Sequence, residues 1–342
     1  MIKIAVDSMG SDNSPFSEVE GSVQAAKAYD VNVILVGKES LLAPLLKEAG
    51  GHGLPIEIRN ATQVIAMDEA PTAALRKKKD SSIRVAADLV RERVASGLVS
   101  AGNTGAVMAI SKMVFGSVPG VDRPALAAIL PTLAGHAVLL DVGANVACKP
   151  NHLLQFAVMG HLFSKKIVGV SSPRVGLMSV GEEESKGNEL TKEVHKALKQ
   201  LHLNFIGNVE GRDIYNGRAD VIVCDGFTGN VALKTSEGLI EAVLKLLKDE
   251  LSRNLQAKLG ALLSQQSFKR LKKRLDYSEY GGAPLLGLRG VSIICHGRSS
   301  SNAIKNAIRV AKEFAENQVN AKLETELDQI NHLAKGIESA DA

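Results

Sequence analysis

Residues 221–235, VIVCDGFTGNVALKT, join an apolar strand to a helix through a polar glycine turn. The apolar run 221–224 predicts a buried strand, and the helix is expected to begin near Thr228 or Asn230. The first turn of a helix leaves backbone N–H groups free, and such groups bind anions, most often phosphate. The turn also carries a carboxylate, a hydroxyl, an amide and an ammonium group, on Asp225, Thr228, Asn230 and Lys234. An ordinary βα turn with a capped helix explains this stretch equally well.

A second turn of this kind follows the apolar run 97–100. That run leads at once into AGNTGAV, residues 101–107, and then into a helix. Asn103 and Thr104 are side-chain donors in the turn, beside Gly105. The stretch therefore predicts another anion-binding helix start.

Two further strand ends carry polar residues. The strand predicted at 137–140 runs into a turn that Asn145 and Lys149 flank. The first strand, 2–6, ends in the loop 7–15, which contains Asp7 and Gly10. Because α/β proteins place ligands at the carboxyl ends of their strands, these loops are candidate binding segments.

Lys186 and His296 also follow predicted strands. Lys186 lies in GEEESKGNE, residues 181–189, where three carboxylates usually form a solvated loop but can also orient a lysine. His296 follows the strand predicted at 291–295. A single histidine is more often structural, yet at a strand's ligand edge it can transfer a proton near neutral pH.

The motifs that are missing exclude several classes of enzyme. The three cysteines, Cys148, Cys224 and Cys295, lack zinc-site spacing and are expected to be reduced. No G-x-G-x-x-G follows the first strand, which argues against a nicotinamide dehydrogenase, and no G-x-S-x-G is present for a serine hydrolase. The residues alone therefore indicate a phosphate-handling transferase.

Strands that alternate with helices along the chain must position these residues. This pattern predicts an α/β fold with a doubly wound, mostly parallel sheet, whose turns meet at one edge. After residue 228 the pattern changes to two basic amphipathic helices, which predict a helical hairpin over 228–276. Such a pair usually packs in a core or a dimer, although an anionic membrane or an acidic partner would also suit it.

The composition is that of a soluble α/β protein. Hydrophobic residues make up 45% of the 342 residues, which is enough for one large domain or two smaller ones. The net charge of +4 is too small for a general nucleic-acid binder. The first residues do not form a signal peptide, and the longest apolar stretch is interrupted, so we expect a cytoplasmic protein. A local basic cluster at Arg76–Lys79 is either a solvated turn or a cationic wall.

At these turns the sequence resembles the bacterial phosphate acyltransferase (PlsX) family, and the resemblance runs from Ile2 to about Ala311. The matching segments are long and specific: MDEAP, RKKKDSS, SAGNTGA, DVGANV, CKPNHLLQFAVMG, GEEESKGNELTKE, NFIGNVEGRDI, ADVIVCDGFTGNVALKT, GGAPLLG and ICHG. Three positions depart from the family pattern. The first loop reads SMGSD, Ala147 replaces a common acidic residue, and Arg298 adds bulk after ICHG.

The resemblance implies reversible transfer of a long acyl group from acyl-carrier protein to inorganic phosphate. The acyl phosphate would then feed a membrane glycerol-3-phosphate acyltransferase (PlsY type) in phospholipid synthesis. It also implies an isocitrate/isopropylmalate dehydrogenase-like, Rossmann-like fold without the cofactor, a homodimer, and peripheral contact with anionic membrane. We assign no residue to a metal. We accordingly expect one domain over 1–320, including the hairpin, and a C-terminal helical tail over 321–342.

With that resemblance in view, the candidate residues take expected roles. We expect Asn103, Thr104, Thr228, Asn230 and adjacent backbone N–H groups to hold phosphate, Lys149, Lys186 and Lys234 to neutralise charge, and His296 to assist the leaving thiol. The candidate catalytic residues are Lys186, Lys234, His296 and Asn230. The candidate substrate- and phosphate-binding residues are Asp7, Gly10, Asn103, Thr104, Gly105, Asn145, Lys149, Asp225, Gly226, Thr228 and Gly229.

Two other functions remain open. A phosphotransacetylase-like enzyme would catalyse the same type of reaction with acyl-CoA as the donor. A binding module would hold acyl phosphate or lipid without turnover. The basic cluster and the hairpin are the candidate surface for the acidic carrier protein or for anionic lipid.

Overall fold

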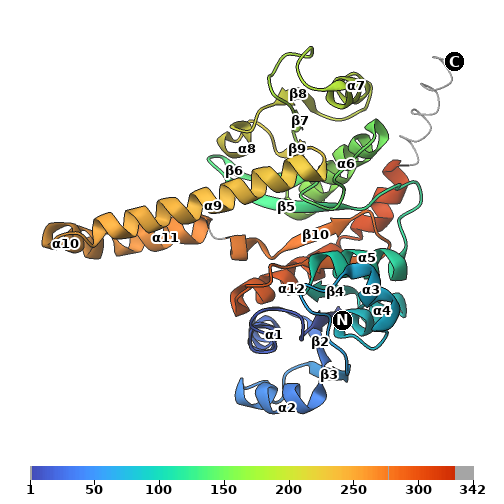
Figure 1. Cartoon of the computed structure of the whole chain (residues 1–342), viewed down its shortest axis with the longest axis vertical. Helices are drawn as coiled ribbons and strands as arrows, with labels where there is room; N and C mark the ends of the chain where they lie inside the picture. The colour runs from blue at the N-terminus through green and yellow to red at the C-terminus, as the bar shows by residue number, and fades with distance from the viewer. Residues whose placement is uncertain (1, 276, 328–342) are drawn as a thin grey trace.

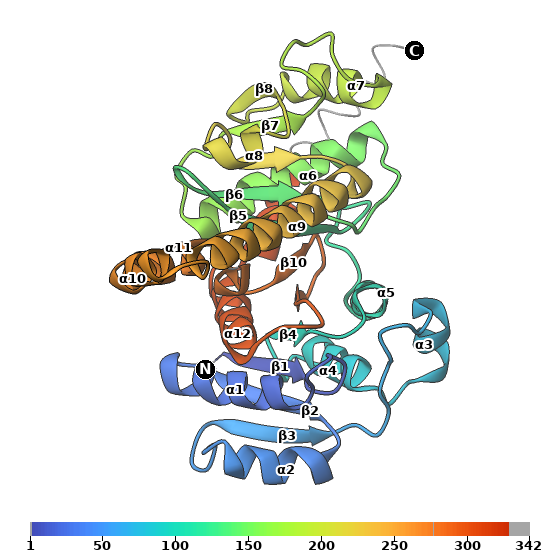
Figure 2. The same cartoon turned by 60° about the vertical axis from the view of Figure 1, so that its left-hand side comes forward.

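The computed structural model describes residues 2–275 and 277–327. In this part of the chain, eleven strands form one sheet in the order β3-β2-β1-β4-β11-β10-β5-β6-β9-β7-β8. Figure 2 shows β3 near the bottom of the molecule and β8 near the top. The strands are β1 Lys3–Asp7, β2 Asn32–Gly37, β3 Ile56–Asn60, β4 Gly97–Ser100, β5 Ala125–Thr132, β6 Gly135–Leu140, β7 Val175–Met178, β8 Phe205–Val209, β9 Val221–Val223, β10 Ala283–Leu286 and β11 Val291–Ile294. The predicted α/β fold with a mostly parallel sheet is confirmed.

Helices cover both faces of the sheet. They are α1 Phe16–Ala28, α2 Glu39–Glu48, α3 Pro71–Lys77, α4 Ser82–Arg91, α5 Thr104–Phe115, α6 Pro150–Phe163, α7 Glu189–Leu198, α8 Asp213–Asn216, α9 Gly226–Leu251, α10 Leu255–Leu263, α11 Gln265–Leu275 and α12 Ser301–Glu316, with a π-helical turn at Ser164–Val168 and a 3₁₀ turn at Tyr277–Tyr280. Successive strand residues enter opposite cores, as Ile4 and Val6 do on one face and Ala5 on the other. This burial on both faces explains why the strands read as continuous apolar runs.

The direction of the strands reverses in the middle of the sheet. Strand β10 pairs antiparallel with β11 and with β5, and β5 pairs antiparallel with β6. The strands β3, β2, β1, β4 and β11 therefore point opposite to β6, β9, β7 and β8. The prediction that all the turns share one edge is wrong. The two antiparallel pairings of β10 cancel, so β5 runs in the direction of β11, and the reversal comes from the β5–β6 hairpin, in which Thr132 pairs with Gly135.

The predicted helical hairpin projects from the sheet (Figure 1). Its first helix, α9, begins at Gly226, slightly earlier than expected, and its return is two helices, α10 and α11, where the sequence suggested one. At the base of the hairpin, Arg274 Nη2 donates hydrogen bonds to the carbonyl oxygens of Thr132 (2.6 Å) and Leu133 (3.2 Å). The base is thus tied to the β5–β6 turn.

Two other segments differ from the simple expectation. The basic cluster includes the end of helix α3, and Lys78 is half-buried because it pairs with Glu69. Residues 319–327 are helical, and Leu323 and Leu327 are buried in the core. The remainder of the predicted C-terminal tail, 328–342, lies outside the described residues.

Candidate active site

A cavity of about 200 Å³ lies between the two halves of the molecule. Its lining includes four of the predicted site residues, Thr104, Asn230, Lys234 and His296. Thr104 and His296 come from the half that contains β4 and β11, whereas Asn230 and Lys234 lie on α9, which follows β9. The reversal of the sheet therefore brings polar groups from two opposite sets of strand ends to one cavity.

The start of α5 presents unpaired N–H groups at this cavity. Asn103 caps the helix, because its Oδ1 accepts the Ala106 N–H at 3.0 Å. Within the described residues, the N–H groups of Thr104 and Gly105 make no hydrogen bond, and Thr104 is exposed. These two groups and the Thr104 hydroxyl can bind an anion, as the sequence predicted.

Asn103 itself has a different part from the one expected. Its Nδ2 group donates to the carbonyl oxygens of Ala66, Met67 and Glu69, at 2.8–3.2 Å. Both ends of this buried amide are thus occupied by backbone. Asn103 fixes the loop before α3 against the start of α5, so it shapes the turn without offering its side chain to phosphate.

The start of α9 is closed by a carboxylate of its own. Asp225 accepts hydrogen bonds from the Thr228 N–H and from the Thr228 hydroxyl, both at 2.8 Å. The Gly226 N–H donates to the Asn145 carbonyl at 2.8 Å. A negative side chain already occupies the position that a bound anion would take. Asp225, Gly226 and Thr228 therefore cap α9 and hold it to the loop after β6.

Close backbone packing explains two of the predicted glycines. A Cβ at Gly229 would lie 1.9 Å from the Asp141 carbonyl oxygen, and one at Gly10 would lie 2.9 Å from the Gly102 Cα. Each glycine lets two loops approach where a side chain would not fit. Their contribution to the site is to bring α9 and the loop after β1 close to their neighbours.

The loop after β6 is organised by a buried carboxylate that the sequence reading missed. Asp141 accepts hydrogen bonds from the N–H groups of Leu126, Gly143, Ala144 and Asn145, and from the Asn145 side chain. Asn145 Nδ2 also donates to the Pro124 carbonyl at 2.8 Å. Asn145 is consequently a buried structural amide. The only sequence clue to Asp141 was its place directly after an apolar strand.

Asp7 lies behind the α5 turn and not in the cavity. It is 1% exposed, and its Oδ2 accepts the Ser100 hydroxyl at 2.6 Å. Ser100 Oγ in turn accepts the Gly102 N–H at 3.1 Å. Burial raises the pKa of Asp7 above its usual range. Asp7 thus supports the turn that presents Thr104.

The hydrogen bond to His296 defines which nitrogen holds its proton. His296 Nδ1 accepts the Arg298 N–H at 3.2 Å. The neutral ring must therefore carry its proton on Nε2. His296 lines the cavity and can donate a hydrogen bond through that nitrogen, which suits its predicted part in assisting the leaving thiol.

Of the predicted lysines, Lys234 lines the cavity, where its Nζ lies 2.7 Å from Glu237. Lys149 and Lys186 are exposed on the loops after β6 and β7 and are not among the residues that line it. Sequence reading missed Glu237, although its position three residues after Lys234 puts both on one face of α9. It also missed Tyr280, which lines the cavity just before the glycine pair of GGAPLLG.

The thiol of Cys295 also lines the cavity. Burial, with Glu18 nearby, raises its pKa to about 12. A thiol with such a pKa is not ionised at neutral pH and is a poor nucleophile. The cavity therefore lacks an activated cysteine.

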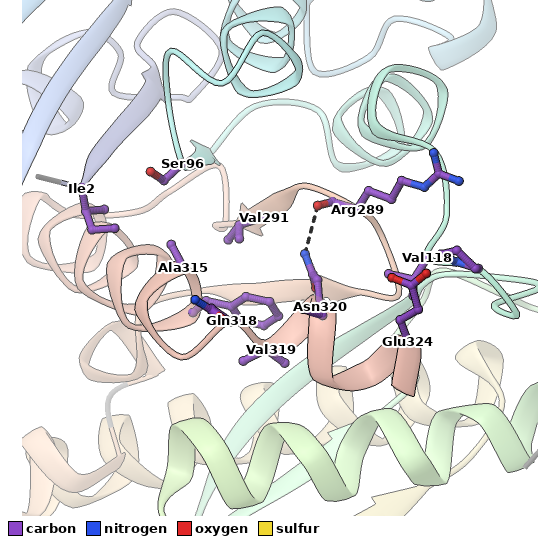
Figure 3. A pocket seen from close by; sticks show the side chains of 13 residues that line it. Ile2, Ser96, Val118, Arg289, Val291, Ala315, Gln318, Val319, Asn320 and Glu324 are labelled. Atoms are coloured by element: carbon purple, nitrogen blue, oxygen red, sulfur yellow. Dashed lines mark hydrogen bonds between the residues drawn. The ribbon is translucent and has the colours of Figure 1, made fainter. Parts of the chain in front are cut away.

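A larger cavity, about 620 Å³, lies at the opposite ends of the strands. It is formed by residues that precede β1, β4 and β11, among them Ile2, Ser96 and Arg289, and by the segment after α12 (Figure 3). Asn320 Nδ2 donates to the Arg289 carbonyl across it at 3.3 Å. None of the predicted site residues lines this cavity. Ligands of α/β sheets bind at the carboxyl ends of strands, so size alone does not make it the active site.

No cluster of three or more His, Cys, Asp or Glu side chains in the described residues has the arrangement of a metal site. Within 2–275 and 277–327, no helix has the length and hydropathy that crossing a membrane would need.

The fold is that of the phosphotransacylases. It superposes on the EutD phosphotransacetylase from Staphylococcus aureus with a TM-score of 0.61 at 18% identity, covering 92% of this chain and 94% of that one. A branched-chain phosphotransacylase from Enterococcus faecalis V583 superposes with a TM-score of 0.58 at 13% identity, over 92% of this chain and 99% of the other.

The sequence relationship is more specific. The family model described as "Fatty acid synthesis protein" matches residues 2–322. A phosphate acyltransferase from Acidobacterium capsulatum is 57% identical over 94% of this chain and 96% of its own length, and one from Geotalea uraniireducens is 53% identical over 96% and 95%. The chain belongs to this phosphate acyltransferase family and is an acyltransferase that uses phosphate, as the resemblance implied.

Proposed function

We propose that the protein transfers a long-chain acyl group from acyl-carrier protein to inorganic phosphate. The observation that carries the proposal is the convergence of the α5 start, Asn230, Lys234 and His296 on one cavity. A phosphate dianion fits the open N–H groups of Thr104 and Gly105, with Lys234 nearby. The Asn230 amide makes no hydrogen bond within the described residues and is available to the substrate.

In the proposed reaction, a phosphate oxygen attacks the thioester carbonyl carbon directly. The new C–O bond forms as the C–S bond breaks, and the sulfur leaves as a thiolate. The Nε2–H of His296 donates a hydrogen bond to the leaving sulfur, and the sulfur takes the proton of the attacking hydrogen phosphate, so the products are acyl phosphate and free thiol. The high pKa of Cys295 supports direct attack, because that thiol is un-ionised and cannot form an acyl-enzyme readily.

The surrounding residues position this chemistry in the proposal. Asn103 and Asp7 fix the α5 turn, while Asp225 and Asn145 fix α9. Lys149 and Lys186 stay in the proposal as loop cations that attract the dianion, because both lie on exposed loops that follow strands of the second half. No cofactor takes part.

The proposed donor is supported by charge. Acyl-carrier protein is acidic, and Arg76, Lys77 and Lys79 are exposed at the end of α3, which follows the loop that Asn103 holds. Charge complementarity speeds encounter and is screened by salt. We expect the KM for the carrier-protein donor to rise several-fold between about 0.05 and 0.5 M salt, with kcat nearly constant. A flat KM would argue against this docking surface.

Membrane contact and dimerisation complete the proposal. Helix α10, at the tip of the hairpin, has no buried residue, and its Leu255 and Leu263 are more than 80% exposed. Basic residues of α11 follow it along the hairpin. Exposed leucines beside basic residues suit the surface of an anionic membrane, where the glycerol-3-phosphate acyltransferase would collect the product.

The exposed apolar residues of α9 suit a second copy of the chain in a homodimer.

The direct test is thiol release from palmitoyl-carrier protein with and without phosphate, using palmitoyl-CoA as the parallel donor. We expect phosphate-dependent release from the carrier-protein thioester. Release from the CoA thioester alone would instead identify a phosphotransacetylase-like donor preference. Absence of release from both donors would favour a binding module that holds acyl phosphate or lipid.

A further inference from the structure

A second cavity adjoins the candidate active site. It has a volume of about 230 Å³ and lies between α9, α11, α8 and strand β5. Its lining is mainly apolar and includes Pro131, Ile240, Leu244 and Leu275. The two cavities share four lining residues, Ile129, Leu130, Leu233 and Glu237.

One face of α9 runs through both cavities. Asn230 and Leu233 are followed on this face by Glu237, Ile240 and Leu244, at spacings of three or four residues. The last four are half-buried, whereas most of the remaining surface of the helix is exposed. The stripe carries the polar side chains of Asn230 and Glu237 on either side of Leu233, and it is apolar from Ile240 onward.

We propose that this second cavity holds the hydrocarbon chain of the acyl donor. The inference rests on the proposed function, because it requires the thioester carbonyl to sit near Asn230. Since the chain is covalently attached to that carbonyl, it must leave the reaction site along a connected path. The shared lining at Ile129, Leu130 and Leu233 provides an apolar one, and burial of methylene groups against it would hold the chain.

The stripe is long enough for this occupant. Leu244 follows Asn230 by fourteen positions, which is about 21 Å along the helix at 1.5 Å per residue. One leaflet of a bilayer's hydrocarbon core, which is the depth of one acyl chain, is about 15 Å. From a carbonyl near Asn230, a long acyl chain of that length therefore reaches about Ile240, and a bulky side chain at position 244 leans back over this turn because helical side chains point toward the N-terminus. A chain of about half that length ends before Glu237.

The test fills the far end of the cavity with a bulky side chain, which the variant Leu244→Trp introduces. Leu246→Trp is the matched control, with the same substitution on the same helix at a residue that is 65% exposed and does not line the cavity. Thermal unfolding of both variants is measured first, and Leu244→Phe is used if Leu244→Trp does not fold.

Activity is then compared for octanoyl- and palmitoyl-carrier protein. For Leu244→Trp we expect kcat/KM with the palmitoyl donor to fall about tenfold or more, and that with the octanoyl donor to stay within about twofold. Leu246→Trp should leave the ratio of kcat/KM for the palmitoyl donor to kcat/KM for the octanoyl donor unchanged. Equal loss with both donors, or an unchanged ratio in a folded Leu244→Trp protein, would overturn the proposal.

A binding measurement separates this inference from the proposed reaction. The fluorescence of cis-parinaric acid, a long-chain fatty acid, rises when its chain enters an apolar site. We expect the wild type and Leu246→Trp to bind it, in competition with palmitate, and Leu244→Trp to bind it about tenfold more weakly. If the wild type releases no thiol but the three proteins show this pattern, the reaction fails and the chain site stands. Equal binding by all three proteins would overturn the chain site.

Discussion

The starts of α5 and α9 carry the same local pattern of strand, glycine-containing turn and polar helix start, yet the structure uses them differently. Helix α5 is capped by the neutral amide of Asn103, and within the described residues the next two N–H groups, on Thr104 and Gly105, make no hydrogen bond. Thr104 lines the cavity. Helix α9 is capped by the carboxylate of Asp225. An anion and a carboxylate compete for the same positive helix end, so only the neutral cap leaves a phosphate site.

The two helix starts also differ in what they contribute to the cavity. Helix α5 offers its backbone and Thr104, whereas α9 offers side chains from its second turn onward, Asn230 and Lys234. The carboxylate cap costs α9 its anion site but fixes the helix on the loop that Asp141 organises. In the proposed site the start of α5 binds phosphate, whereas the start of α9 holds α9 in position.

The largest expected effect comes from giving α5 a carboxylate as well. Thr104→Asp places a negative charge at the proposed phosphate site, and unit charges 4 Å apart repel by about 4 kcal/mol at an effective dielectric of about 20. We expect kcat/KM for phosphate to fall by roughly a thousandfold, with little change in thermal stability.

Phe227→Asp is the control, because Phe227 lies in the first turn of α9 and is exposed. It should leave the KM for phosphate nearly unchanged. Steady-state kinetics with varied phosphate measures both variants. If Phe227→Asp has the larger effect, phosphate binds at α9 and the comparison is reversed.

The buried carboxyl group of Glu18 lies near Asp7, which supports the α5 turn. Burial, with Asp7 nearby, raises the pKa of Glu18 from 4.5 to about 7. The folded protein thus holds this proton more tightly than the unfolded chain, so the free energy of unfolding falls as pH rises from about 4.5 to 7. The loss at pH 8 amounts to about 3 kcal/mol.

Glu18→Gln should remove this pH dependence and stabilise the protein by about the same amount at pH 8, with little effect near pH 4.5. Denaturant unfolding at several pH values measures it. Parallel pH profiles of the two proteins would show that Glu18 does not titrate in this range.

The smallest effect on phosphate binding is expected at the start of α9, which holds the helix in position and does not bind phosphate in the proposal. Asp225→Ala removes the bonds to the Thr228 N–H and hydroxyl, and loss of such a cap costs about 1 kcal/mol of stability. The KM for phosphate should change by no more than about twofold. Chemical denaturation and phosphate titration check the two quantities separately. A large rise in KM with unchanged stability would mean that Asp225 acts on the substrate.

Much of the fold was readable from the sequence because it depends on local pattern. Apolar runs at 97–100 and 221–224 predicted β4 and β9 almost to the residue, and the helices between the strands followed from alternation. Strand β10 was missed, because four residues between glycines carry too little pattern to identify an antiparallel strand.

For the site, the sequence identified which residue types are present at the turns. It did not show which of their side chains are free to bind a substrate. It indicated Thr104, Asn230, Lys234 and His296, and all four line one cavity. It also indicated Asn103 and Asn145, whose amides are taken by backbone carbonyls from segments more than twenty residues away. Hydrogen bonds between distant segments leave no trace in a local motif.

By itself, the sequence determined that this is an α/β protein with anion-binding turns, and its long motifs determined its family. These properties follow from periodicity and from residue types at short spacing. Only the tertiary structure decided which turn keeps its N–H groups open and that opposite strand ends meet in one cavity. It also decided that the apolar face of α9 continues from that cavity, because each depends on pairing between segments that are far apart in the chain.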